Sequence, residues 1–275
     1  MPLRSVATTA AFVLGVLAPF TARATATAHI VQGPLRTTLI DLDTKDGIAP
    51  SLSVQLIPTI PERSDIMHWR GVNFHGETAL GGSGFLDRSY DDVGQSGAVK
   101  ISNAGSIDSM LLDARATTSF ALGMDGRVEA TATSSWIQFQ LSPHTEVVLG
   151  SSAQASGSVT DTGLHEYARA QSEMNVKLAF ADGRVSFWSN GLTSEASTSD
   201  PGLPLSFDGQ QNFDITFRND SDAVASGYVV ADAFVWTSSA ALPVPEPSMA
   251  WMLGPGLLVL GWRGRGKRPE PIAAV

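Results

Sequence analysis

The sequence predicts an all-β fold, an antiparallel β-sandwich of jelly-roll or immunoglobulin-like type, flanked by an N-terminal signal helix and a short C-terminal transmembrane helix. Apolar and polar residues alternate with a period of two in many short runs, as in antiparallel sheets with one solvated face. Turn-forming residues separate these runs, and no stretch of the body keeps a helical period over three turns. Together these observations favour strands joined by short turns.

The alternation defines the predicted strands. Met174–Phe180 places four apolar side chains on one face, and Phe213–Arg218 places three there. In Ile137–Leu141 the apolar residues alternate with two glutamines. Shorter predicted strands are Thr37–Leu42, Leu52–Ile57, Ile66–Phe74, Val99–Ile101, Thr117–Leu122, Val147–Leu149 and Tyr228–Trp236.

Glycine-containing segments predict the connections between strands. Asp125-Gly126 and Asp182-Gly183 each lie between two strand-like runs, and Asp-Gly tolerates the positive φ of a tight hairpin turn. Two longer segments, 81–97 and 191–204, are rich in small and polar turn-forming residues and are predicted to be loops.

The N-terminal segment 1–28 predicts a secretory signal peptide. Arg4 supplies the charged region, and Val6–Phe20 is largely apolar. Alternating alanines then give three overlapping A-x-A sites, which end at Ala24, Ala26 and Ala28. Export would use signal peptidase and the general secretion machinery, with the cut left open among the three sites.

A short apolar segment near the C-terminus predicts transient insertion into the inner membrane. Met249–Trp262 has 14 residues, and a helix of that length reaches about 21 Å. The hydrocarbon core of a bilayer is about 30 Å thick, so the segment is shorter than a permanent anchor. Cations that follow it would stay in the cytoplasm and leave the body outside; they are Arg263, Arg265, Lys267 and Arg268.

A Pro-Glu-Pro motif immediately precedes this segment, in Val244, Pro245, Glu246, Pro247 and Ser248. The order of motif, apolar run and basic cluster resembles the PEP-CTERM protein-sorting signal of exopolysaccharide-making Gram-negative bacteria. The resemblance implies that an exosortase, a membrane transpeptidase-like protease, reads the signal and that the product reaches the cell surface or the extracellular space. The implied domains are a signal peptide (1–28), a β-sandwich body (29–242), the sorting signal (243–268) and a tail (269–275).

Three segments of the body also resemble exported PEP-CTERM proteins of uncharacterised function. The first is Leu42–Leu52, which contains Asp-Gly-Ile-Ala-Pro-Ser, and the second is Phe139–Val147, which contains Pro-His-Thr. The third is Phe217–Ser221, followed by Gly227-Tyr-Val-Val. The resemblance implies export and a β-rich fold, and it implies no reaction.

Charge and cysteine content narrow the classes of partner. Six of the 18 cations lie in the two predicted signals, so residues 29–247 carry 12 cations against 26 anions, a net charge of −14. Such a body repels nucleic acid and anionic lipid. The chain has no cysteine, which excludes disulfides, thiolate metal sites and cysteine nucleophiles.

The sequence contains no catalytic motif and no metal-binding motif. The aspartates around Gly47 suggest a calcium loop, but Lys45 and Leu52 stand where an EF-hand needs ligands. Surface calcium on turn aspartates stays an alternative, with no other cofactor expected, and the histidines lack zinc-site spacing. A cut after Ala28 would make His29 the N-terminal residue, which resembles the copper-binding brace of lytic polysaccharide monooxygenases.

Four of the six tryptophans lie in the predicted body, where each either packs in the core or stacks on a sugar; they are Trp69, Trp136, Trp188 and Trp236.

The predicted function is that of an exported, non-enzymatic protein of the envelope or extracellular matrix, associated with exopolysaccharide or biofilm. A carbohydrate-binding, lectin-like module is the first alternative, and a polysaccharide-active enzyme is the second.

Overall fold

The computed structural model describes residues 23–56, 61–82, 84–104, 106–121, 125–160 and 165–240. These residues form fifteen β-strands and no helix, so none of them belongs to a helix able to cross a membrane. All of the strand pairs are antiparallel, which confirms the predicted all-β class. The chain divides into Met1–Ala241 and Leu242–Val275, and the described residues belong to the first unit. Both predicted terminal helices lie outside the described residues.

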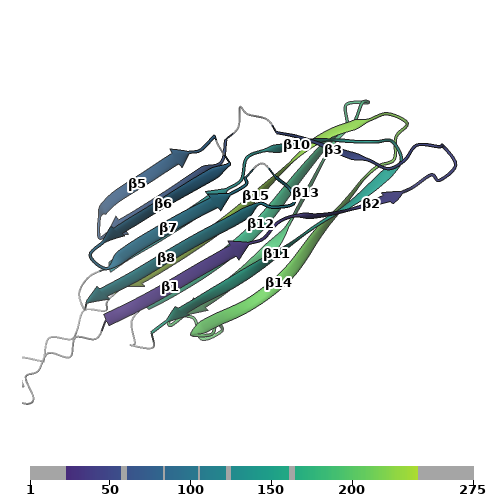
Figure 1. Cartoon of the computed structure of the whole chain (residues 1–275). Coiled ribbons are helices and arrows are strands. Elements are labelled where there is room, and N and C mark those ends of the chain that lie inside the picture. The colour runs from purple at the N-terminus through teal and green to yellow at the C-terminus, as the bar shows by residue number, and fades with distance from the viewer. Residues whose placement is uncertain are drawn as a thin grey trace, which may run out of the picture. The chain divides into compact units, whose positions relative to one another are not determined.

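One sheet has seven strands in the order β14-β11-β1-β8-β7-β6, with β2 also paired to β11. These strands run side by side from β6 to β14 (Figure 1). The bounds are β1 (Arg23–Gln32), β2 (Arg36–Asp41), β6 (Phe85–Asp92), β7 (Gln95–Ser102), β8 (Leu111–Ala121), β11 (Thr145–Val159) and β14 (Ser206–Asn219). Because β1 pairs with β8 on one side and β11 on the other, it is a central strand.

The other sheet has eight strands in the order β13-β12-β15-β9-β4-β5, and β15 also pairs with β10, which pairs with β3. The bounds are β3 (Leu52–Leu56), β4 (Arg63–Arg70), β5 (Asn73–Leu80), β9 (Asp125–Thr133), β10 (Ile137–Leu141), β12 (His165–Ala179), β13 (Val185–Ser197) and β15 (Ala225–Ala240). The long strand β12 pairs with β15 along its whole length, and the two form the middle of this sheet.

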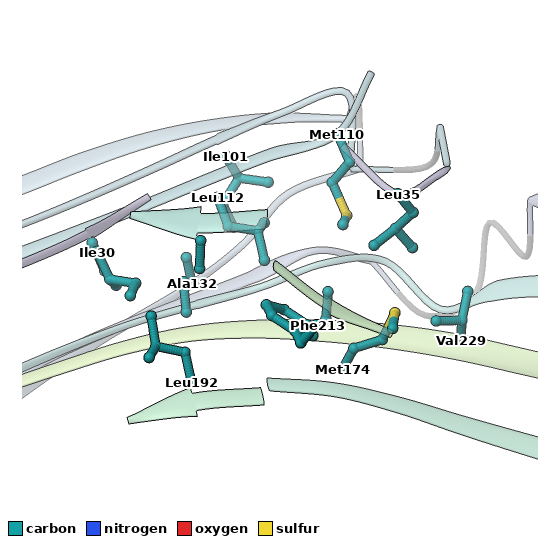
Figure 2. Close-up of a cluster of buried hydrophobic side chains, with 14 of the residues drawn as sticks. Ile30, Leu35, Ile101, Met110, Leu112, Ala132, Met174, Leu192, Phe213 and Val229 are labelled. Atoms are coloured by element: carbon teal, nitrogen blue, oxygen red, sulfur yellow. The ribbon is translucent and has the colours of Figure 1, made fainter. Parts of the chain in front are cut away.

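The two sheets stack face to face, with β1 and β8 packed against β15. Alternate residues of each long strand are buried between the sheets, as the period-two pattern predicts. Buried alanines line the inner faces of β1, β8, β9, β12 and β15, and their small side chains let the sheets approach closely. Larger side chains such as Leu112 and Met174 point into the same layer (Figure 2).

Two predicted turns have different outcomes. Asp182-Gly183 forms the expected turn between β12 and β13, with φ of 87° at Gly183. Asp125-Gly126 instead begins β9, and β8 and β9 belong to different sheets, so the predicted hairpin is wrong. This part of the chain crosses between the sheets.

Three predicted segments also need correction. The predicted loop 191–204 is wrong over 191–197, because these residues belong to β13 and pair with β12. The run Ile66–Phe74 is not one strand, because β4 ends at Arg70 and β5 begins at Asn73 after a turn with φ of 55° at Gly71. The predicted loop 81–97 contains β6 and the start of β7. Most of β6 is solvent-exposed at the sheet edge, so its polar residues gave no strand-like alternation.

Candidate functional site

An aromatic groove lies on the outer face of the eight-stranded sheet. It is an open depression of about 270 Å³. We define it by Trp136, Asn175, Lys177, Phe187 and Tyr228, which are among the residues that line it. Trp136 immediately precedes β10, and the other four belong to β12, β13 and β15.

The strand register brings these side chains together. Lys177 of β12 lies directly opposite Phe187 on one neighbour and Tyr228 on the other. Directly paired residues of a sheet point to the same face, so the three form one row across β13, β12 and β15. The preceding residue, Val176, is buried between the sheets, which leaves Lys177 on the solvent side.

The groove combines aromatic rings with polar groups. The rings of Trp136 and Tyr228 stack, with centroids 4.2 Å apart and an interplanar angle of 20°. The Lys177 ammonium lies 5.4 Å from the ring centroid of Phe187 and 5.6 Å from that of Tyr228. Phe187 is 69% exposed, which is unusual for so large an apolar side chain. Exposed rings beside an ammonium and an amide suit a ligand with both apolar and hydroxyl-bearing faces.

Two carboxylates face each other on the same sheet. Glu173 of β12 lies directly opposite Asp232 of β15. Ser189 donates a hydrogen bond to Glu173 Oε1 over 2.6 Å, and Thr133 donates one to Asp232 Oδ1 over 2.7 Å. Burial raises the pKa of Asp232, the Glu173 charge raises it further, and the Thr133 hydrogen bond partly offsets the rise. Ser189 also lines the aromatic groove, so the pair lies beside it.

A second aromatic cluster surrounds Arg127. Its guanidinium carbon lies 4.7 Å from the ring centroid of Trp69 and 4.1 Å from that of Trp236. Arg127 also pairs with Glu129, and Trp69 contacts the ring of Phe74 at 5.1 Å. The cation occupies a face of each indole ring, so these tryptophans are already engaged within the protein.

The four predicted aromatics therefore have different environments. Trp136 lines the groove, whereas Trp69 and Trp236 flank Arg127. Trp188 borders the groove, but its ring packs against the buried Phe217 with centroids 5.7 Å apart.

Sequence reasoning missed four of the five residues that define the groove, Asn175, Lys177, Phe187 and Tyr228. Lys177 was visible as a polar position in the alternating run Met174–Phe180. Its two aromatic neighbours come from different strands, and only the register shows that they meet.

The turn aspartates hold the backbone of their own turns. Asp41 Oδ1 accepts a hydrogen bond from the N–H of Asp43, and Asp46 Oδ1 accepts one from the N–H of Ile48. His29 lies within β1, with Nε2 3.0 Å from Asp113 Oδ1. Among the described residues, no three His, Asp or Glu side chains are grouped so that they could hold a metal ion.

The predicted sorting motif Val244–Ser248 and the basic residues between Arg263 and Arg268 lie outside the described residues. The aromatic groove is therefore the candidate site among the residues that the structure describes. The chain matches no protein-family model, no curated protein sequence and no solved structure.

Proposed function

We propose that this chain is an exported, non-catalytic protein of the extracellular matrix that binds polysaccharide through the aromatic groove. The observation that carries the proposal is the row of Phe187, Lys177 and Tyr228, with Trp136 stacked on Tyr228. A sugar ring has apolar C–H faces that pack on aromatic rings and hydroxyl groups that bond to amide and ammonium groups. The groove offers both kinds of partner on one surface.

Sorting through an exosortase completes the proposal. The order of Pro245-Glu246-Pro247, the apolar run and the basic cluster supports transient insertion in the inner membrane, followed by cutting near the motif. The strong negative charge of the body supports a soluble product outside the cell rather than one bound to nucleic acid or anionic lipid. Two stacked antiparallel sheets support the finer proposal of a jelly-roll or immunoglobulin-like fold.

Retention of the purified secreted protein on gels that contain polysaccharide tests the binding. We expect Trp136→Ala and Phe187→Ala each to weaken retention about tenfold, which corresponds to about 1.4 kcal/mol. Trp69→Ala is the matched control, because Trp69 lies on the same sheet beside Arg127 and outside the groove. Unchanged retention of both groove variants, or failure of the parent protein to bind any matrix polysaccharide, would contradict the proposal.

Sorting needs its own experiment. Mass spectrometry of the product from cells with and without exosortase locates its C-terminus. We expect a cut near Pro245–Pro247 only when exosortase is present, and an uncut C-terminus in both strains would contradict the sorting proposal.

Polysaccharide cleavage is a second candidate, favoured by the opposed carboxylates Glu173 and Asp232. Two neighbouring carboxyl groups, one of them with a raised pKa, are the kind of arrangement that glycoside hydrolysis uses for acid and base. Release of reducing ends from a bound polysaccharide, abolished in Asp232→Asn while retention persists, would favour this candidate over simple binding.

A further inference from the structure

The central strand β1 begins within the region where the sequence offers three signal-peptidase sites. Ala24 and Ala26 are 0% exposed and Ala28 is 3% exposed, so all three side chains belong to the inner face of the sandwich. The predicted start of the body, His29, lies inside the strand. The three possible cuts therefore leave very different amounts of a central strand.

Strand pairing ranks the three cuts. β1 pairs with β11 from Ala26 to Gln32 and with β8 from Arg23 to Gln32. A cut after Ala24 keeps all seven pairs with β11 and eight of the ten with β8. A cut after Ala28 keeps four on each side and leaves backbone groups of β8 and β11 unpaired in the middle of the sheet.

Thr25 is held at the start of the shortened strand. Its N–H donates to Thr160 Oγ1 over 3.0 Å, and its carbonyl accepts from the N–H of Thr160 over 3.0 Å. The Thr25 hydroxyl also lies 3.1 Å from the hydroxyl oxygen of Ser119. A cut after Ala26 or Ala28 would remove all of these contacts.

A buried carboxylate lies next to this position. Thr160 Oγ1 donates to Glu166, whose carboxylate oxygens are 2.7 and 3.0 Å away. Glu166 is 0% exposed. The backbone nitrogen of Thr25 therefore lies one hydroxyl group away from a buried acidic side chain, where a positive charge is favourable.

We propose that signal peptidase cuts after Ala24 and that Thr25 becomes the N-terminal residue of the exported protein. Hydrolysis of the peptide bond between Ala24 and Thr25 leaves a carboxylate on the released peptide and an ammonium on Thr25. The new ammonium keeps its hydrogen bond to Thr160 and adds a cation beside the Glu166 carboxylate. The inference rests on the proposed export, because an unexported chain meets no signal peptidase.

Mass spectrometry of the N-terminal peptide of the exported protein tests the site. We expect a single start at Thr25. A start at Arg23, Thr27, His29 or any other residue after cleavage would overturn this inference and leave export intact. A chain that retains Met1 and stays in the cell would overturn the proposed export itself, so the two failures are distinguishable.

Two variants test the physical reasons. Ala22→Leu removes the small residue at the first position of the A-x-A site that ends at Ala24, and we expect the fraction starting at Thr25 to fall at least tenfold. For Glu166→Gln in the exported protein, we expect a loss of stability that shrinks above about pH 8, where an α-ammonium deprotonates. The same measurement on Glu146→Gln is the control. If Glu166→Gln loses the same amount of stability at every pH from about 6 to 9.5, the proposed contact between ammonium and carboxylate is wrong.

Discussion

Asn219 donates a hydrogen bond from Nδ2 to the carbonyl oxygen of Ser142 over 3.0 Å. The same amide donates to the carbonyl oxygens of Leu141 and Ala223, at 3.3 and 2.7 Å, and the residue is 0% exposed. Ser142 is in turn linked to Ser51, whose N–H donates to the Ser142 hydroxyl over 2.8 Å. Asn219 is thus a buried connection between β14 and the turn after β10.

This connection joins the three segments from which the sequence analysis predicted membership of a family of exported proteins. Leu52 pairs with Leu141 in β10, and Thr145 pairs with Asn219 in β14. The segments 42–52, 139–147 and 217–221 therefore meet in one region of the sandwich, and Gly227 joins them by pairing with Phe139. Asn219, Ser142 and Ser51 secure turns and strand ends there, which is a structural role for these three segments.

Asn219→Ala should destabilise the protein strongly. The change removes an amide whose two N–H bonds serve three carbonyl oxygens, and it costs about 1–3 kcal/mol for each buried carbonyl that stays unsatisfied. We expect the free energy of unfolding, measured with urea, to fall by about 3 kcal/mol. Asn190→Ala is the control, because this exposed amide also donates to a carbonyl, that of Asp214, and water can replace it. Equal effects of the two changes would contradict the role given to Asn219.

Glu62→Gln should destabilise the connection between β5 and β6. Glu62 Oε1 accepts from the N–H groups of Gly82 and Gly84, and Oε2 accepts from the Ser135 hydroxyl. Burial acts to raise the Glu62 pKa, but the hydrogen bonds outweigh it and the pKa lies below its usual 4.5. The stabilisation is therefore complete above about pH 4.5 and is lost as the pH falls toward the lowered pKa.

Urea unfolding at about pH 7 and pH 3.5 tests this expectation. We expect Glu62→Gln to cost about 2 kcal/mol at the higher pH and clearly less at the lower pH. Glu77→Gln is the control, because its side chain is 56% exposed. A cost that is the same at both pH values would show that the Glu62 charge does not stabilise the fold.

The fold class was predictable because alternation is a local property of the sequence. Met174–Phe180 indicated β12 directly, and Asp182-Gly183 indicated its turn. Asp125-Gly126 has the same local chemistry, yet the choice of sheet for β9 depends on distant partners such as β4 and β15. The groove was predictable only through Trp136, because Phe187 and Tyr228 reach Lys177 through a register that no local pattern specifies.

Asp232→Asn should stabilise the protein at neutral pH. The pKa of Asp232 is raised by burial and by Glu173, so the folded state holds its proton to a higher pH than the unfolded state does. Stability is therefore lost as the pH rises from about 4 through the raised pKa. Like charges directly opposite in a sheet cost up to about 1 kcal/mol, and the variant removes that cost. Urea unfolding at about pH 7 should show a gain for Asp232→Asn and none for the exposed Asp91→Asn. If Asp232→Asn is instead less stable than the parent protein, the hydrogen bond from Thr133 stabilises the fold only when Asp232 carries its negative charge.

His68 should make the edge of the sandwich sensitive to acid. Its ring stacks on Tyr90 of β6, with centroids 3.7 Å apart, and lies 4.9 Å from the ring of His75 on β5. Burial lowers the His68 pKa, the charge of His75 lowers it further, and Asp92 and Glu77 partly oppose the shift. The neutral ring is the form that suits the fold, so its stabilisation is complete above about pH 6.5 and is lost as the pH falls through the lowered pKa.

His68→Phe should keep the stacking and remove this titration. The His68 Nδ1 atom is buried without a hydrogen-bond partner among the described residues, so the phenyl ring loses no hydrogen bond there. We expect urea unfolding of the parent protein to show a fall in stability from about pH 7.5 to pH 5 that is smaller in His68→Phe. The control is His165→Phe, which also removes one histidine but an exposed one. We expect this variant to lose as much stability between these pH values as the parent protein does. A loss of stability in acid that depends on His68 must disappear when its imidazole is removed. If His68→Phe loses as much stability in acid as the parent protein and His165→Phe do, His68 is not the acid-sensitive group.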